Sequence, residues 1–61
     1  MNIELKDGSK LVIDGPKSAY EIAKQIGERL AKVALVCKID GVLTSMREVI
    51  DHDCKFEVLT S

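Results

Sequence analysis

The sequence is poor in aromatic residues, with no tryptophan, one tyrosine and one phenylalanine among 61 residues. Aliphatic side chains must therefore build its core. The formal net charge of −1 excludes a strongly basic nucleic-acid-binding module, so we expect no DNA partner. No apolar run approaches the roughly 18 residues of a membrane helix, and the N-terminal residues lack the pattern of a secretory signal. We expect a cytoplasmic protein with no membrane partner.

The chain has only two cysteines, Cys37 and Cys54, whereas a secreted scaffold of this size usually carries more. Their spacing fits no zinc motif, and the single histidine, His52, adds little to one. We expect two buried free thiols in a reducing compartment and no metal. The sequence does not give the distance between the two residues, so a disulfide stays open as the alternative.

A chain of this length forms one small domain, without room for both a large core and an enclosed active-site cavity. Its composition, 46% hydrophobic and 31% charged, is typical of globular proteins. The sequence stops directly after a predicted strand, as in a module cut from, or fused to, something longer. We therefore expect a single domain over residues 1–61 that is a fragment of a multidomain protein.

The first quarter of the chain predicts a β-hairpin. Residues 2–6 alternate between apolar and polar side chains, as in a half-buried strand. Asp7-Gly8 favours a tight turn, and residues 11–13 form the returning strand. Gly15-Pro16 then ends this strand.

A helix follows, and its start is marked by a capping box of Ser18 and Glu21. In such a box the serine hydroxyl accepts the glutamate N–H, and the carboxylate reaches back to the serine amide. Its apolar face consists of Ala19, Ile22, Ala23 and Ile26. Gly27 is expected in the left-handed position after the helix. Residues 28–32 are interpreted as a turn, with Leu30 beneath the core.

The apolar, β-branched segment 33–39 predicts a third strand. At alternate positions of this strand, the side chains that share one face are those of Leu35, Cys37 and Ile39. Asp40-Gly41 predicts a second tight turn into a strand over residues 42–44.

Residues 45–53 form a connection anchored by Met46 and Ile50, and residues 55–59 form the last strand, with Phe56 and Val58 facing the core. The order β-β-α-β-β-β predicts an α+β fold with one helix packed on a mixed sheet of four or five strands. We expect the first and last strands to pair in parallel at its centre, which is a β-grasp arrangement. The residues expected at the centre of the core are Ile22, Ile26, Leu35, Ile39 and Phe56.

No catalytic constellation is visible, because the chain lacks a Gly-x-Ser-x-Gly motif and a glycine-rich phosphate loop. The densest acidic cluster is Asp51-His52-Asp53 with nearby Glu48. Such a cluster could form a weak divalent-metal or general-base site. We interpret it as a solvated loop, because groups dispersed on one loop lack the fixed geometry that catalysis needs. We expect no enzyme activity and no cofactor in this domain.

Charge is uneven along the chain, with −1 over residues 1–14, +3 over residues 15–39 and −3 over residues 40–61. The basic residues of the middle segment are Lys17, Lys24, Arg29, Lys32 and Lys38. We predict that they form a face for RNA or a protein partner, since contacts to phosphates release counterions. An ordinary solvated surface is the alternative.

Several segments of the chain, in the same order, resemble a TGS domain. They are residues 3–9, 18–23, 27–41, 50–53 and 56–60. The likeness covers nearly the whole chain and implies a β-grasp fold, in agreement with the order of elements derived above.

TGS domains occur in threonyl-tRNA synthetases, in a class of GTPases and in synthetase/hydrolases of guanosine tetraphosphate. Two features resemble the N-terminal module of the synthetases: Met1 lies directly before the first strand, and the central segment reads Leu30-Ala31-Lys32. The synthetases commonly carry a basic residue at the position of Val33, where this chain differs. The resemblance implies a non-catalytic regulatory or docking module for tRNA or neighbouring domains in tRNA aminoacylation. ATP and zinc would then belong to other domains of the aminoacyl-tRNA ligase.

The alternative is a regulatory domain of the guanosine-tetraphosphate enzymes or of the GTPases, which would bind a ligand or a ribosome-associated partner. The guanosine-tetraphosphate enzymes usually carry a histidine, associated with the tRNA acceptor end, where this chain has Lys32.

Overall fold

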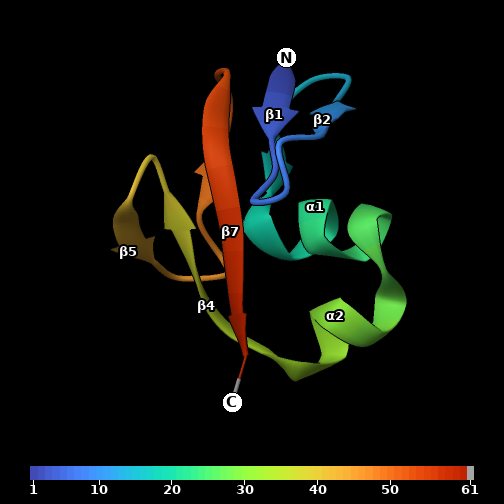
Figure 1. The fold of residues 1–61 in the computed structure, drawn as a ribbon, viewed down its shortest axis with the longest axis vertical. Helices are drawn as coiled ribbons and strands as arrows, with labels where there is room; N and C mark the ends of the chain where they lie inside the picture. The colour runs from blue at the N-terminus through green and yellow to red at the C-terminus, as the bar shows by residue number, and fades with distance from the viewer. Residues whose placement is uncertain (61) are drawn as a thin grey trace.

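The computed structural model describes residues 1–60 and has an α+β architecture (Figure 1). Its elements are β1 (Asn2–Glu4), β2 (Lys10–Val12), β3 (Lys17–Ser18), α1 (Ala19–Ile26), α2 (Glu28–Val33), β4 (Ala34–Ile39), β5 (Val42–Thr44), β6 (Val49–Ile50) and β7 (Cys54–Thr60). The main sheet has five strands in the order β2-β1-β7-β4-β5, and β3 and β6 form a separate two-stranded sheet.

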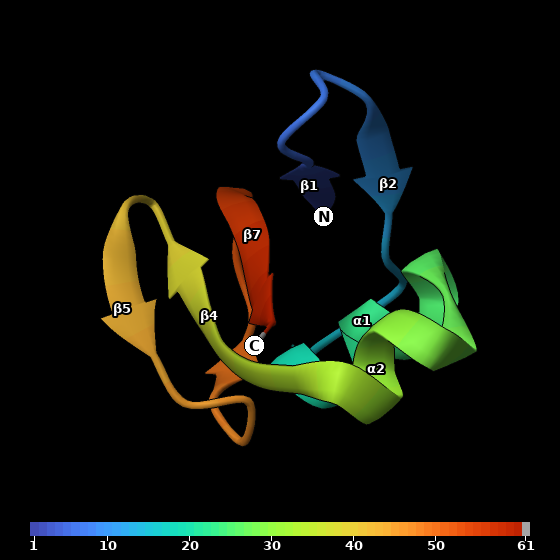
Figure 2. The same cartoon turned by 60° about the horizontal axis from the view of Figure 1, so that its bottom comes forward.

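The first and last strands lie at the centre of the main sheet. β1 pairs with β7 in parallel, with Ile3 opposite Cys54 and Glu4 opposite Lys55. The outer pairs are antiparallel, and α1 and α2 lie on one side of the sheet (Figure 2). The predicted β-grasp arrangement is therefore confirmed.

Both predicted tight turns are present. In the first, Leu5 N–H donates to the Ser9 carbonyl at 2.8 Å, and Gly8 N–H donates to the Leu5 carbonyl at 3.0 Å. In the second, Asp40 and Gly41 have φ values of 53° and 82°. Positive φ at both central residues is what a type I′ hairpin turn requires, so the Asp-Gly pair sets this turn.

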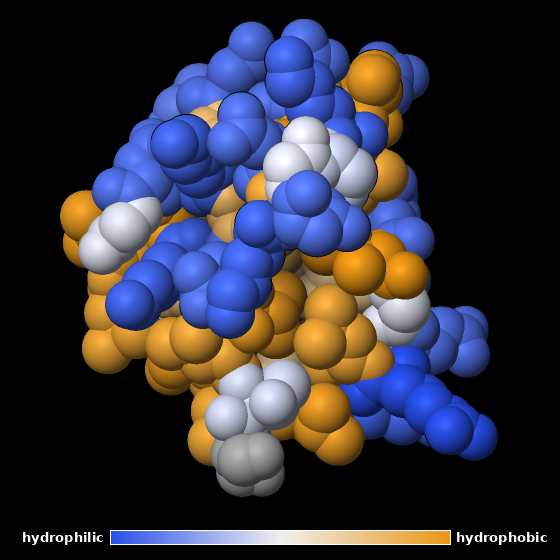
Figure 3. Space-filling model, in the orientation of Figure 1, coloured by the Kyte–Doolittle hydropathy of each residue, from blue (hydrophilic) through white to orange (hydrophobic). Residues whose placement is uncertain are grey.

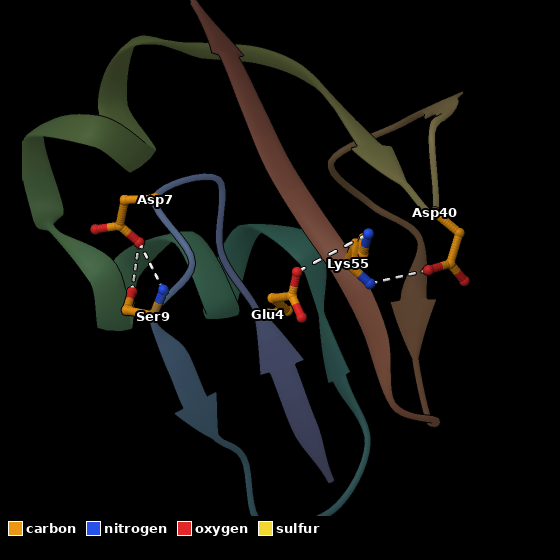
Figure 4. Close-up of polar contacts among 5 residues, drawn as sticks. All are labelled: Glu4, Asp7, Ser9, Asp40 and Lys55. Carbon is orange, nitrogen blue, oxygen red and sulfur yellow. Dashed lines mark hydrogen bonds and ion pairs between the residues drawn. The ribbon is translucent and has the colours of Figure 1, made fainter.

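Asp40 also ties the second turn to the central strand. Its backbone N–H donates to the Lys55 carbonyl at 2.9 Å, and its Oδ1 accepts the Lys55 N–H at 2.9 Å (Figure 4). On the same strand, Lys55 Nζ lies 4.0 Å from Glu4 Oε2 of β1.

The start of α1 is capped by Ser18, as predicted. Ser18 Oγ accepts the Glu21 N–H at 3.2 Å and lies 3.4 Å from Glu21 Oε1. The carboxylate thus contacts the serine hydroxyl, whereas the prediction directed it to the serine amide.

The connection after β5 is also fixed to the start of α1. The carbonyls of Glu48 and Met46 accept the N–H groups of Ala19 at 2.8 Å and Tyr20 at 2.9 Å. Beside these bonds, β3 and β6 pair with Lys17 opposite Ile50. The anchoring of this connection was predicted from the sequence, but its strand pairing was not.

The segment after α1 differs from the prediction. Gly27 has φ −179°, which is extended and not left-handed, because helix α2 follows directly over residues 28–33. A turn was predicted over residues 28–32, and Val33, predicted to begin the next strand, is the last residue of this helix. The Gly27 carbonyl accepts the Ala31 N–H at 3.1 Å as part of this helix. Ala31 is buried and Leu30 is half-buried.

Two of the predicted central core residues, Leu35 and Ile26, are exposed. The register between β4 and β7 shifts between Ala34 and Val36, so Leu35 is the extra residue of a bulge and is 63% exposed. Ile26 ends α1 beside an open groove and is 38% exposed. Because of the bulge, the Leu35 side chain does not share the buried face of the sheet with Cys37, although the two residues are two positions apart.

Among residues 1–60, eight buried side chains from both helix and sheet form the main core cluster, and Ala23 and Ala31 are buried as well. The eight are Ile3, Ile13, Ala19, Ile22, Cys37, Ile50, Cys54 and Phe56. Ile22 and Phe56 are confirmed as core residues, and Ile39 packs against the cluster while partly buried. Both cysteines are buried free thiols.

Candidate functional site

Three of the five predicted basic residues come from adjoining parts of the two helices. Arg29 and Lys32 are exposed and lie one turn apart on α2, which places them on one face. Lys24 lies in the last turn of α1, with Nζ 5.8 Å from the centroid of the Tyr20 ring. Within residues 1–60 none of the three forms an ion pair.

The other two predicted residues lie elsewhere. Lys38 alternates with buried Cys37 on β4, so it lies on the sheet face opposite the helices, where Glu57 is its cross-strand neighbour. Lys17 is half-buried in β3, before the start of α1, whereas Lys24 lies at the other end of that helix. Proximity in the sequence grouped residues that the fold separates.

An apolar groove of about 560 Å³, which was not predicted from the sequence, lies between the first turn, the two helices and β7. Its apolar lining consists of Leu5, Ile26, Leu30, Phe56 and Val58. Figure 3 shows the neighbouring apolar surface over α2 and the lower ends of β4 and β7. The four-residue spacing of Ile26 and Leu30 is the sequence signal that could have predicted one apolar helical face here. Gly27, which lies between them, indicated a helix end instead.

Charged side chains line the rim of this groove, namely Lys6, Asp7 and Glu57. Lys6 Nζ lies 3.7 Å from Glu57 Oε2. Asp7 Oδ1 accepts the Ser9 hydroxyl at 2.6 Å and the Ser9 N–H at 3.0 Å. These bonds from Ser9 lower the pKa of Asp7 below its usual value, so the carboxylate is ionised at neutral pH. Its second oxygen points away from Ser9 (Figure 4).

The acidic loop around His52 has mainly local contacts. His52 Nδ1 lies 3.1 Å from Asp51 Oδ1, and both side chains are exposed. Asp53 Oδ1 accepts the Asn2 N–H at 2.7 Å, which ties the loop to β1. Among residues 1–60 no three histidine, cysteine, aspartate or glutamate side chains gather as a metal site. In the same part of the chain no helix is long and apolar enough to cross a membrane.

Comparison with known proteins decides the family, because residues 1–60 match the TGS domain. The chain belongs to the TGS domain family. Similar proteins include the threonine–tRNA ligases of Stenotrophomonas maltophilia, 39% identical over 61 residues, and Rickettsia rickettsii, 44% identical over 61 residues. The threonine–tRNA ligase of Halorhodospira halophila is 44% identical over 59 residues, or 97% of the chain.

This TGS domain spans about a tenth of the length of those relatives, 10% of the first two and 9% of the third. The family match agrees with the β-grasp topology of the main sheet, which has its first and last strands in parallel at the centre. The predicted resemblance is therefore confirmed over nearly the whole chain.

Proposed function

We propose that this TGS domain is a non-catalytic, N-terminal docking module of a threonine–tRNA ligase and contacts RNA through Lys24, Arg29 and Lys32. In this proposal the domain takes part in tRNA aminoacylation by positioning the tRNA. Threonine activation, with ATP and zinc, belongs to segments of the cytoplasmic ligase outside these 61 residues.

The relatives support this proposal over a guanosine-tetraphosphate enzyme or a GTPase. The three relatives described above carry the name threonine–tRNA ligase, and each aligns over 97–100% of the chain.

The observation that carries the RNA contact is that three exposed cations of α1 and α2 have no ion-pair partner in residues 1–60. A phosphate backbone supplies the missing negative charges and releases its counterions. Tyr20 is the aromatic residue closest to them in the sequence, and its ring already faces Lys24. We therefore infer contacts to phosphates rather than stacking of bases.

The test is the affinity of the full ligase for tRNA as a function of salt concentration. The variant Lys24→Gln/Arg29→Gln/Lys32→Gln removes three positive charges. The control variant Lys6→Gln/Lys10→Gln/Lys55→Gln removes the same number from other surfaces. The first variant should weaken binding and lower the slope of log affinity against log salt by about one per lost phosphate contact.

The control variant should change the salt slope much less, because its three lysines do not lie on the two helices. Equal slopes for the two variants would show that only the net charge matters. An unchanged affinity of the helix variant would overturn the RNA contact.

A further inference from the structure

The apolar groove beside the first turn contains exposed hydrophobic surface that the proposed RNA contact does not use. Its helical wall includes Ile26, 38% exposed, and half-buried Leu30, and its floor includes Phe56, which belongs to the core. Exposed apolar side chains that line one concave surface mark an interaction site more often than scattered ones do.

The rim of the groove carries an excess of negative charge. Lys6 and Glu57 are within ion-pair distance and offset each other, but Asp7 has no cation within 4.0 Å in residues 1–60. Ser9 occupies one oxygen of Asp7, and the other is free to accept a donor (Figure 4). An occupant that complements this groove has an aliphatic side chain with an arginine or lysine beside it.

We propose that the groove binds such a segment, an aliphatic residue next to an arginine or lysine, from the same ligase polypeptide outside residues 1–61. The proposal rests on the proposed function, because it requires this domain to be part of a longer chain. The matched relatives have about ten times the length of the domain, so such a polypeptide has ample sequence to supply the segment.

The strength of the contact favours a segment of the same polypeptide over a free partner. One buried aliphatic side chain and one solvent-exposed ion pair support dissociation constants of about a millimolar or weaker. A covalent linker provides effective concentrations of about a millimolar or more, which suffices for such a contact. A separate protein at cellular concentrations would leave the groove mostly empty.

The test compares cysteine labelling of the groove in the full ligase and in the 61-residue chain. Ile26→Cys places a thiol in the groove, whereas Cys37 and Cys54 are buried with raised pKa and label slowly. The labelled fraction is measured by mass spectrometry of the peptide that contains residue 26, without tRNA. Val12→Cys, at a position 74% exposed on the edge strand β2, is the control.

We expect Ile26→Cys to label at least about twofold more slowly in the full ligase, because an effective concentration equal to a dissociation constant of about a millimolar leaves the groove half occupied. Val12→Cys should label at the same rate in both. Adding Asp7→Asn should restore much of the labelling at residue 26 in the ligase and change little in the isolated chain. Equal labelling of Ile26→Cys in ligase and chain overturns the proposal. If the protection survives Asp7→Asn, the occupant does not carry the proposed arginine or lysine beside Asp7.

These outcomes are separate from those of the proposed function. Tight tRNA binding that depends on the helix cations, together with an unprotected groove, overturns only the intramolecular contact. A native protein of 6.7 kDa, seen by mass spectrometry of the source cell, would overturn both.

Discussion

The thiols of Cys37 and Cys54 lie in the core as free cysteines, and their ionisation couples the stability of the fold to alkaline pH. Burial raises the pKa of both above the ordinary value of 9.0. Negative charge adds to this effect, from Glu48 for Cys37 and from Asp40 and Asp53 for Cys54. The folded protein therefore holds these two protons more tightly than the unfolded chain does.

The sign of the pH effect follows from this difference. The stabilisation is fully present below pH 9.0 and is lost as pH rises through the folded-state pKa values. We expect the free energy of unfolding, measured in urea, to fall above pH 9.0. The variant Cys37→Ala/Cys54→Ala should be less stable at neutral pH but lose less of its stability on alkalinisation. An equal loss in both proteins would contradict the role of the thiols.

Ile22 and Leu35 provide a second prediction, because the sequence pattern placed both at the core centre. Ile22 is fully buried against the sheet, and Leu35 is 63% exposed at the bulge of β4. Ile22→Ala should cost about 2–5 kcal/mol of unfolding free energy, as buried aliphatic truncations do. Leu35→Ala should cost only about 0.5 kcal/mol, as is usual for exposed positions. Urea denaturation of both variants measures the difference, and similar losses would mean that the bulge is misplaced.

Elements with strong local signals were predicted from the sequence, and elements formed by tertiary contacts were not. The two Asp-Gly turns and the Ser18 cap act over a few residues, so their signals are present in the sequence itself. Helix α2 has only six residues and no side-chain cap, and β3 and β6 have two residues each. Such short elements are stable only where neighbours pack on them, which no local pattern reveals.

The cap of α1 is the element most open to direct measurement. Ser18 Oγ accepts the Glu21 N–H, while the first two amides of the helix are held by the loop before β6. Ser18→Ala should therefore cost about 1 kcal/mol, the usual value for a lost N-cap. Ser18→Asp, which keeps an acceptor, should differ from the wild type by only a few tenths of a kcal/mol. Equal destabilisation of the two variants in urea denaturation would place the effect in β3 rather than in the cap.

At the scale of the whole molecule, the candidate site shows that the net charge of a sequence segment does not predict which charged residues share a surface. The middle segment carries the net charge of +3, and the sequence predicted one basic face from it. The β-grasp topology places Lys38 on the open face of the sheet and Arg29 and Lys32 on a helix on the other side. The apolar groove likewise joins side chains from β7, both helices and the first turn, which are distant in sequence.

The strand order also determines which backbone positions the whole fold depends on. β1 lies between β2 and β7, whereas β2 is an edge strand. Met1 and Ile13 exchange two backbone hydrogen bonds, at 2.8 and 2.9 Å. Because such pairs alternate along an antiparallel ladder, the Val12 N–H points away from β1. By the same alternation the Glu4 N–H points toward β7, on the side where the Asn2 N–H meets Asp53.

Proline substitutions at these two positions test the topology with a matched change. Glu4→Pro removes a donor from the central parallel pair, where proline is essentially not found, and the lost ladder bond alone should cost about 1–3 kcal/mol. That loss is a large part of the whole stability of a domain of this size, about 3–9 kcal/mol, so cooperative thermal unfolding should weaken or disappear. Val12→Pro removes an N–H that faces solvent on an edge strand, where proline is tolerated, and should retain a cooperative transition. If Val12→Pro proved the more damaging, β2 rather than β1 would be the inner strand, and the parallel pairing of β1 with β7 would be wrong.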